Sequence, residues 1–340
     1  MGTRWLYSVP MLEEFDDSAE ESQDSGRRPR HRMSRRRRIA VSVLAFLLLV
    51  VIGIGGYAWF LSSKVDRNLA REDLIGESRD KTTSGQKLVD DAGENYLLLG
   101  SDSRPGDSGR ADVIQLVHVD KAKENVWIIH FPRDLYVDIP GHGKNKINAA
   151  FAFGQSPLLV TTIEDLVGVK IDHVARTDFE GFQKLTDALG GVTVHNAQAS
   201  PKYPEGPTNL DGDSALEYVR ERKTLAEGDI SRGERQQAWL KGIMSKTLTP
   251  RVLLNPAKLN RVIDAGTKHT VVDNDLTGGE IRKQAIGMRS IRGGDIHFLT
   301  APFSGFGTSP DGQSIDVLDE QGMKSLSDAL RTDHLESYQE

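Results

Sequence analysis

The longest apolar stretch of the chain runs from Ile39 to Leu61 and carries no charged side chain. Its 23 residues exceed the roughly 20 that a helix needs to cross the hydrocarbon core of a bilayer. Four consecutive arginines, at 35–38, directly precede it, whereas charges of both signs follow it. Because positive charge is kept on the cytoplasmic side, the pattern predicts a single-pass membrane protein with a cytoplasmic N-terminus and an extracellular remainder. A cleaved signal peptide is the alternative, but its apolar core would be shorter and would end at small residues.

Polar segments flank this apolar run on both sides. Residues 1–38 combine acidic and basic clusters with few large apolar side chains, which predicts a disordered cytoplasmic tail. Residues 62–94 are also largely polar and are expected to form an extracellular stalk. The folded domain is then expected to occupy residues 95–340.

Within that domain, short β-rich runs alternate with longer helical patterns, which predicts a mixed α/β fold around a central sheet. Residues 111–120 and 125–131 predict a hairpin. A helical pattern over 148–167 must be interrupted at Gly154 and Pro157. The other predicted strands are 96–99, 173–177, 192–194, 270–272, 296–300 and 314–317, with 173–194 forming a strand–helix–strand unit. The other predicted helices are 179–189, 212–220, 231–249, 256–265, 279–291 and 320–330.

Composition narrows the possible functions. The chain has 43 Lys+Arg against 49 Asp+Glu and a formal net charge of −6. Binding to a nucleic-acid backbone needs a basic face, so this balance argues against a general nucleic-acid role. The chain contains no cysteine, which excludes disulfide frameworks, thiolate nucleophiles and cysteine-ligated metal sites.

Charged residues concentrate in two loops at the ends of predicted strands. The first loop contains Asp102, followed by Arg110 and Asp112 at the start of the next strand. The second contains Arg133 and Asp134. Ligands commonly bind at strand ends of open α/β sheets. Polar groups in these loops are therefore stronger functional candidates than the same residues on a helix face.

A third charged cluster lies further along the chain. Ser231 and Glu234 have the spacing of a capping box, which predicts a helix start near Ser231. Arg232 and Gln236 would then share one face of that helix. The candidate binding residues of this cluster are Arg220, Arg222, Arg232, Arg235 and Gln236.

So many arginines suit a ligand that contains phosphate. Guanidinium is planar, permanently charged and bidentate toward phosphate oxygens. Several arginines and a divalent cation would together neutralise a pyrophosphate. Asp102 and Asp112 offer the carboxylate oxygens that Mg²⁺ takes, with water and substrate phosphate completing its shell. Each residue alone would more simply form a surface ion pair worth about 0–1 kcal/mol, so the hypothesis depends on their joint arrangement.

At these positions the chain resembles the LytR-CpsA-Psr family of bacterial cell-envelope phosphotransferases. The resemblance implies a cytoplasmic tail, one membrane helix and an extracellular three-layer α/β/α domain with a central mixed sheet. A weaker match continues through HFLTAP. The main matching segments lie in family order within the core motifs at 95–237: NYLLLGSDSR, GRADVIQLVHVD, HFPRDLYVDIPG, KINAAFAFG, TDFEGFQKLTDALGGVTV, LDGDSALEYVRER and DISRGERQQ.

The activity implied by this resemblance is Mg²⁺-dependent transfer of a glycopolymer, as in polyisoprenyl-teichoic acid–peptidoglycan transferases. A muramic-acid C6 hydroxyl of peptidoglycan would attack the sugar-linked phosphate, and polyprenyl phosphate would leave. The implied partners are a polyprenyl-pyrophosphate-linked glycopolymer, peptidoglycan and the membrane, with no nucleic acid. The polymer itself is left open among teichoic acid, capsule-like polysaccharide and arabinogalactan.

The resemblance also implies roles for individual residues. Asp102 and Asp112 would hold Mg²⁺, with Mn²⁺ as an alternative ion. Either Asp102 or Asp134 would accept the proton of the incoming hydroxyl. The residues implied in pyrophosphate binding are Arg110, Arg133, Arg220, Arg222, Arg232 and Gln236. The residues implied in catalysis are Arg133, Asp134, Arg232 and Arg235.

Two positions depart from the family pattern. His130 precedes the Phe-Pro-Arg-Asp segment, where the family often has a small residue, and Gln155 stands where a second glycine is common. Both departures concern the shape of the pocket more than its charged groups.

Two other functions compete with transfer. A pyrophosphate hydrolase would use water in place of the sugar hydroxyl and release a free sugar phosphate. A non-catalytic membrane protein would bind the carrier lipid or act as a regulator. The nature of the product distinguishes these alternatives.

Overall fold

The computed structural model describes residues 49, 53, 55–77, 79–101, 111–222, 224–226 and 228–338. The chain divides into two units, Met1–Ile54 and Gly55–Glu340, and nearly all described residues belong to the second. None of the described residues forms a helix long and apolar enough to cross a bilayer. The predicted tail at 1–38 and most of the predicted span at 39–61 lie outside the described residues.

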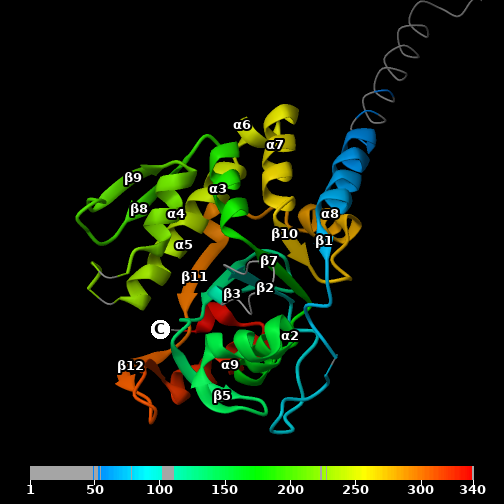
Figure 1. The fold of residues 1–340 in the computed structure, drawn as a ribbon. Coiled ribbons are helices and arrows are strands. Elements are labelled where there is room, and N and C mark those ends of the chain that lie inside the picture. Colours follow the sequence, from blue (N-terminus) through cyan, green and yellow to red (C-terminus); the bar gives the residue numbers. More distant parts are fainter. Residues whose placement is uncertain are drawn as a thin grey trace, which may run out of the picture. The chain divides into compact units, whose positions relative to one another are not determined.

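A seven-stranded mixed sheet forms the centre of the second unit, in the order β1-β10-β7-β2-β3-β4-β11 (Figure 1). Strands β2, β3 and β4 are antiparallel neighbours, which confirms the predicted hairpin. Strand β7 pairs with β2 in parallel, and β11 pairs with β4 in parallel. The bounds are β1 Ala70–Arg71, β2 Glu94–Ser101, β3 Ala111–Val119, β4 Val126–His130, β7 His173–Thr177, β10 Thr270–Val272 and β11 Ile296–Thr300.

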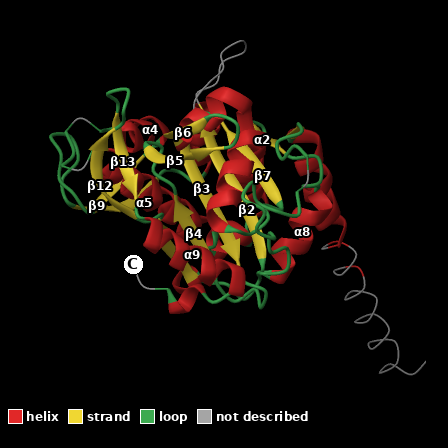
Figure 2. Ribbon diagram, turned by 90° about the horizontal axis from the view of Figure 1, so that it is seen from below, coloured by secondary structure: helices red, strands yellow, loops and turns green. Residues whose placement is uncertain are grey.

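Helices cover both faces of this sheet, which gives three layers. Helices α2 and α9 lie on one face, and α3, α4, α5 and α7 lie on the other side (Figures 1 and 2). The bounds are α2 Ile147–Val167, α3 Phe179–Ala188, α4 Gly212–Arg220, α5 Asp229–Thr247, α6 Pro250–Leu253, α7 Pro256–Thr267, α8 Gly278–Gly287 and α9 Glu320–Thr332, with 3-10 turns η1 Gly293–Asp295 and η2 Leu335–Ser337. Residues 55–68 are also helical.

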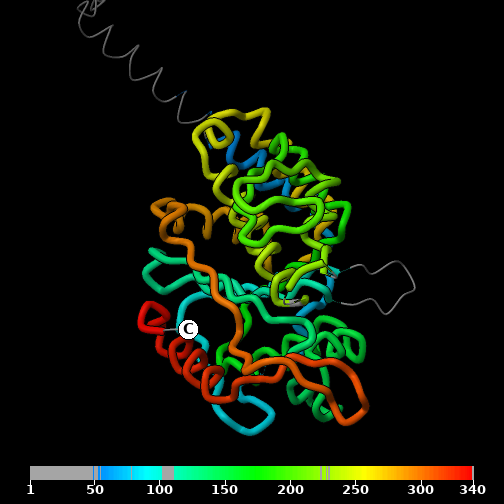
Figure 3. The backbone as a smooth tube through the Cα atoms, turned by 90° about the vertical axis from the view of Figure 1, so that its left-hand side faces the viewer, coloured from blue at the N-terminus to red at the C-terminus, as the bar shows by residue number. Residues whose placement is uncertain are grey.

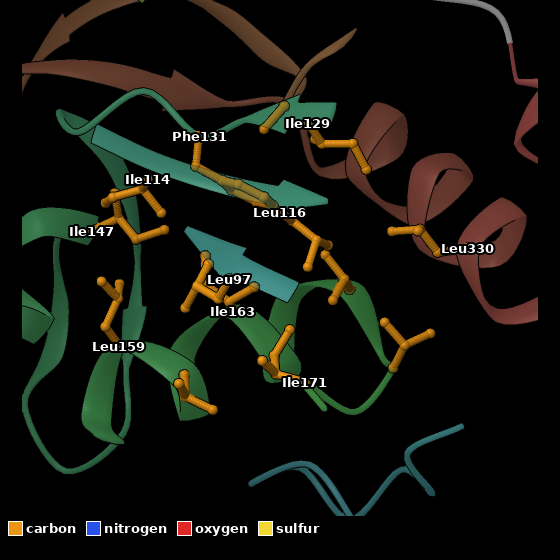
Figure 4. Packing of buried hydrophobic residues seen from close by; sticks show 14 of the residues in the cluster. Leu97, Ile114, Leu116, Ile129, Phe131, Ile147, Leu159, Ile163, Ile171 and Leu330 are labelled. Carbon is orange, nitrogen blue, oxygen red and sulfur yellow. The ribbon is translucent and has the colours of Figure 1, made fainter. Parts of the chain in front are cut away.

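The alternation of side chains along β3 separates the core from the functional face. Ile114 and Leu116 belong to the main apolar cluster with residues of α2 and α9, such as Ile163 and Leu330 (Figure 4). Their neighbours point to the opposite face, because successive side chains of a strand alternate. The face toward α3 and α5 therefore includes the buried Gln115.

Two smaller sheets correct the predicted strand arrangement. The strand predicted at 192–194 leaves the central sheet and forms a hairpin of β8 Val192–Asn196 with β9 Gly206–Leu210. The strand predicted at 314–317 joins a separate sheet in the order β12-β13-β5-β6. A short apolar run predicts a strand but not the strand with which it pairs, so the pattern did not separate these two strands from the central sheet. The bounds of this sheet are β5 Leu135–Ile139, β6 Gly143–Lys146, β12 Phe303–Thr308 and β13 Ser314–Leu318.

The predicted interruption of the 148–167 helix is confirmed. Gly154 and Gln155 depart from helical backbone angles inside α2, and Gln155 has a φ of 56°. Pro157 follows this break, where its missing N–H and fixed φ are tolerated because a new helical turn begins.

The segment at 62–94 packs into the domain, in contrast to the expected stalk. Its strand β1 pairs with β10, and Leu74 is buried in the main apolar cluster with 2% of its surface exposed. Val65 and Leu69 belong to another buried cluster, together with Val272. Scattered leucines supply these contacts, which the polar average of the segment concealed.

We predict that Leu74→Ala lowers the free energy of unfolding of the full chain by about 2–5 kcal/mol, because it removes buried methyl groups and leaves a cavity. The matched control is Leu254→Ala, since Leu254 is 81% exposed and its truncation should change stability by less than about 0.5 kcal/mol. Chemical denaturation in detergent, followed by circular dichroism, measures both. Equal stabilities of the two variants would show that 62–94 is not part of the cooperative unit.

Candidate functional site

A cavity of about 470 Å³ lies between the central sheet and helices α3, α4 and α5. Much of its wall is apolar. Phe182 and Trp239 stack with ring centroids 3.9 Å apart, and the indole N–H of Trp239 donates to Thr186 Oγ1 at 3.0 Å. The polar atom of Trp239 is therefore satisfied, and the rest of the ring can face an apolar ligand. Further apolar lining comes from Val113, Leu185, Val219 and Leu240.

Charged and amide side chains line the same cavity where β3 begins and β4 ends. Because β3 and β4 are antiparallel, the start of one and the end of the other meet at one sheet edge. The first two turns of α5 contribute to this region from the helical layer. The predicted site residues that line the cavity are Asp112, Arg133, Arg220, Arg232 and Gln236.

An ion pair joins the two charged loops predicted from the sequence. The Arg133 guanidinium donates from Nη1 to Asp112 Oδ1 at 2.5 Å, with both side chains partly exposed to the cavity. A guanidinium carries five N–H donors on a planar fork, so one such group can contact a carboxylate and a phosphate oxygen at the same time. This arrangement holds Arg133 in place without neutralising the whole site.

Asp134 lies beside this pair but is not part of the cavity lining. Only 4% of its surface is exposed, and its carboxylate is surrounded by cations. Lys146 Nζ is 3.1 Å from Oδ1, Arg222 Nη2 donates to Oδ2 at 3.1 Å, and Arg133 Nε is 3.9 Å away. Asp134 therefore connects Arg222 to the site.

Helix α5 begins two residues before the predicted start. Its N-cap is Gly228 at φ 53°, and no side chain caps the helix, so the capping box expected for Ser231 and Glu234 is not how the helix starts. Gly228 permits the earlier start because it adopts a positive φ at little cost. Arg232 and Gln236 then fall on the cavity side in the first two turns, as predicted.

Arg235 does not line the cavity. It is 3% exposed and forms an ion pair with Glu221. It also donates to the Gln198 carbonyl at 3.2 Å and lies over the Tyr218 ring at 4.5 Å. These contacts join α5 to the end of α4 and to the β8–β9 hairpin. Arg235 therefore holds α5 in position and does not face the cavity.

Gln236 has a buried atom that fits a ligand role. Its Oε1 finds no hydrogen-bond partner among the described residues, although the residue lines the cavity. An unpaired buried amide costs free energy, and a polar ligand atom would supply the missing partner. Asp102 and Arg110, which were predicted to complete this site, lie outside the described residues.

The described residues supply an accessible carboxylate for a metal ion but not a complete set of ligands. No group of three His, Asp or Glu side chains in the described part of the chain is placed to hold one. Asp112 does present a partly exposed carboxylate to the cavity. Mg²⁺ commonly binds one or two carboxylates and completes its shell with water and phosphate, so Asp112 fits that kind of site.

His130 is a close neighbour of the site that the sequence pattern assigned no function. It is buried, and neither ring nitrogen has a hydrogen-bond partner among the described residues. Burial first, and then the charge of Arg232, lowers the pKa of His130 to about 3. The ring packs so closely on α5 that a Cβ added at Gly233 would collide with it. His130 and Gly233 thus set how closely the first turn of α5 approaches the sheet.

Sequence reasoning missed the residues that shape the cavity. Gln115 could have been predicted from the sequence, because a polar residue within an otherwise apolar strand indicates a polar contact or a binding site. Phe182, Trp239 and Leu240 carried none, because a helix face that packs in a core has the same pattern as one that lines a cavity.

Comparison with known proteins agrees with this geometry. The model of the LytR_cpsA_psr family matches residues 60–332. The chain belongs to the LytR-CpsA-Psr family. The match starts before residue 62, which accords with the packed segment at 62–94.

Two relatives illustrate the family. The polyisoprenyl-teichoic acid–peptidoglycan teichoic acid transferase TagU of Bacillus subtilis is 29% identical over 309 residues, covering 88% of this chain and 97% of TagU. The probable cell wall biosynthesis protein LcpB of Corynebacterium glutamicum is 34% identical over 278 residues, or 75% of this chain and 65% of LcpB. This chain therefore spans slightly less than two thirds of LcpB.

Solved structures of the family share the fold. TagT bound to LI-WTA superposes with a TM-score of 0.60 at 25% identity, covering 76% of this chain and 98% of TagT. The LytR-Csp2A-Psr enzyme from Actinomyces oris gives a TM-score of 0.60 at 21% identity over 78% of this chain and 96% of that enzyme. The mixed α/β architecture expected from the sequence is thereby confirmed.

We predict that Gly233→Ala lowers transfer activity, because the added methyl must displace either the His130 ring or the first turn of α5 that carries Arg232. Adding His130→Ala should restore part of the loss. The control is Gly279→Ala, whose Cβ would meet its nearest neighbour at an ordinary 3.5 Å. Activity and thermal stability of the single and double variants form a double-mutant cycle. Additive losses would contradict a steric coupling.

A second prediction concerns pH. In the folded chain the pKa of His130 is about 3, against an ordinary value of 6.5 for an exposed histidine, so between these values the unfolded chain binds a proton that the folded chain does not. Its contribution to stability is present above pH 6.5 and is lost as the pH falls toward 3. We expect the free energy of unfolding to fall less steeply between pH 7 and 4 in His130→Leu than in the wild type. Parallel curves from denaturation at several pH values would refute this.

Proposed function

We propose that the protein transfers a glycopolymer from a polyprenyl-pyrophosphate carrier to the muramic-acid C6 hydroxyl of peptidoglycan. The proposal rests on one observation above all, an apolar cavity that is also lined by three arginines and two aspartates, Asp112 and Asp178. An apolar wall suits a polyprenyl chain, and the guanidinium groups suit the pyrophosphate joined to it. The names of TagU and of TagT bound to LI-WTA support this assignment.

The chemistry is a phosphoryl transfer. The acceptor hydroxyl oxygen bonds to the phosphorus that carries the sugar, and the anhydride bond to the lipid phosphate breaks. The hydroxyl proton passes to a base, and the negative charge of the leaving polyprenyl phosphate develops beside the arginines. Such reactions depend on positioning and charge neutralisation more than on a protein nucleophile.

Different residues in and around the cavity would bind the phosphates and accept the proton. Arg133, held by Asp112, and Arg232, held on α5, would bind the phosphate oxygens, and Arg220 and Gln236 would complete the contacts. Arg222 contributes through Asp134. Asp134 and Asp102 are the proposed alternatives for the proton acceptor, and in this structure Asp134 is enclosed by Lys146 and Arg222. Arg235 would support Arg232 from the other side of α5.

We propose Mg²⁺ as the cofactor, with Asp112 and Asp102 as its protein ligands. A bound Mg²⁺ would neutralise charge on the phosphate oxygens. Asp112 would then balance the ion and Arg133 together. We also propose that residues 39–61 anchor the chain in the cell membrane, with the N-terminus in the cytoplasm and the catalytic domain outside.

The test uses the full chain in detergent with a synthetic polyprenyl-pyrophosphate oligosaccharide, Mg²⁺ and peptidoglycan fragments. Mass spectrometry should detect a new phosphodiester on the glycan, and chelation should abolish it. Free sugar phosphate would replace the proposal with a hydrolase. Lipid that binds without reacting would replace it with a carrier-binding or regulatory protein.

We predict that Arg133→Ala lowers the rate of transfer by about 10²–10³-fold, the usual cost of losing one group that stabilises developing charge. Arg133→Lys should recover little, because a single ammonium cannot replace a bidentate fork that also binds Asp112. The control is Arg282→Ala, an exposed arginine on α8. Wild-type activity in Arg133→Ala would remove this residue from the site.

A further inference from the structure

An exposed apolar corner joins α5 to α7. The chain turns there through the short helix α6, and the corner comprises residues 248–258. Leu248 is 42% exposed, Leu253 44% and Leu254 81%. None of these three leucines, which lie within seven residues, belongs to a buried apolar cluster of the described residues. Large exposed apolar groups close together mark interaction surfaces.

This α6–α7 corner lies beside the helical stretch at 55–68. Tyr57 donates its hydroxyl hydrogen to the Pro256 carbonyl at 3.1 Å. Lys64 donates to Asp264 at 2.6 Å, and Asn68 donates to the same carboxylate at 2.9 Å. Figures 1 and 3 show α7 and this helical stretch side by side. The contacts fix the corner at the height of Tyr57 along the helix.

Tyr57 belongs to the apolar run that the sequence assigns to the membrane. It stands four residues before the end of that run at Leu61, which is about 6 Å along a helix. Trp59 and Phe60 are exposed beside it. Aromatic residues of this kind collect at the membrane–water interface. If Ile39–Leu61 spans the bilayer, Leu253 and Leu254 therefore lie at the depth of the outer interface.

The charge around the corner is complementary to anionic lipid. Residues 241–262 contain five basic side chains and no acidic one, in a chain whose net charge is −6. Apolar side chains flanked by basic ones are typical of segments that lie in the membrane interface. The basic residues are Lys241, Lys246, Arg251, Lys258 and Arg261.

We propose that the α6–α7 corner rests in the outer leaflet of the bilayer, with Leu253 and Leu254 among the upper acyl chains and Arg251 at anionic phospholipid head groups. This inference rests on the proposed membrane anchor. Its consequence concerns the substrate: α7 leads from Pro256 at the corner to Gly266, which lines the cavity, a distance of about 15 Å along the helix. The corner thus holds the apolar cavity close to the bilayer that supplies the polyprenyl chain.

The absence of cysteine makes a direct test possible. Single cysteines introduced as Leu254→Cys, Leu49→Cys and Phe306→Cys would each carry an environment-sensitive fluorophore. Phe306, which is 59% exposed on β12, is the matched control outside the corner. The full chain would be reconstituted in vesicles containing phosphatidylglycerol and lipids with nitroxide quenchers at the head group, the upper acyl chain or the acyl-chain end near the bilayer centre, where position 49 would lie. We expect quenching at positions 49 and 254 and none at 306.

Each outcome decides a different point. Quenching at 49 with a water-exposed label at 254 would overturn the proposed contact and leave the anchor intact. Water-exposed labels at both positions would overturn the anchor and the contact together. Activity of the detergent-solubilised chain on a short-chain lipid analogue tests the transferase proposal independently of both.

A functional variant provides a second measurement. The double substitution Leu253→Glu and Leu254→Glu should slow transfer from a long-chain carrier in vesicles about tenfold, which corresponds to about 1.4 kcal/mol of lost interaction. The same variant should turn over a water-soluble short-chain analogue at the wild-type rate, because neither leucine lines the cavity. Phe306→Glu is the control for the added charge. An unchanged rate with the long-chain carrier would overturn the role of the corner in substrate access.

Discussion

Mutual repulsion of guanidinium groups at one edge of an apolar cavity is the constraint on which the rest of this domain depends. Like charges that line one cavity and are partly removed from water raise the free energy of the folded state unless carboxylates or a ligand balance them. Carboxylates that balance these charges lie both in the cavity wall and outside it. Asp112 pairs with Arg133 inside the cavity, whereas Asp134 pairs with Arg222 and Glu221 with Arg235 at positions that do not line it. The arginines are thus kept in place while the cavity itself stays cationic.

The antiparallel β3–β4 pair makes this arrangement possible. Asp112 starts one strand, and Arg133 follows the end of the other, so a pairing register set by apolar residues brings the two charges together. The close approach of His130 to Gly233 then brings α5 against the same edge. A neutral imidazole is needed there, because a protonated ring next to Arg232 would add to the repulsion. The close packing against Gly233 and the charge of Arg232 therefore both favour a buried, neutral imidazole at position 130.

Local sequence pattern predicted most elements of the fold but not every sheet partner. The β3–β4 hairpin and the break in α2 followed from turn residues and from glycine and proline, whose effects act within a few residues. The placement of β8 and β13 depended on contacts between distant segments, which alternation of apolar residues does not encode. The same limit applies to the site. Strand-end position correctly brought Arg133 together with Asp112, but Arg232 and Arg235 look equivalent in sequence, and only the contacts of Arg235 with Glu221 and Tyr218 separate them.

Helix α5 links recognition of the two parts of the proposed substrate. Arg232 and Gln236 line the cavity in its first turns, and Trp239 and Leu240 line it one turn later, so one helix face changes from polar to apolar within about 12 Å. A free pyrophosphate would contact the first part and leave the apolar wall exposed to water. A polyprenyl alcohol would contact the second part and leave the guanidinium groups without an anion. Only a molecule with both a phosphate head and an apolar tail satisfies the whole face, and because α5 is a single helix, the spacing between the two contacts is fixed by the fold.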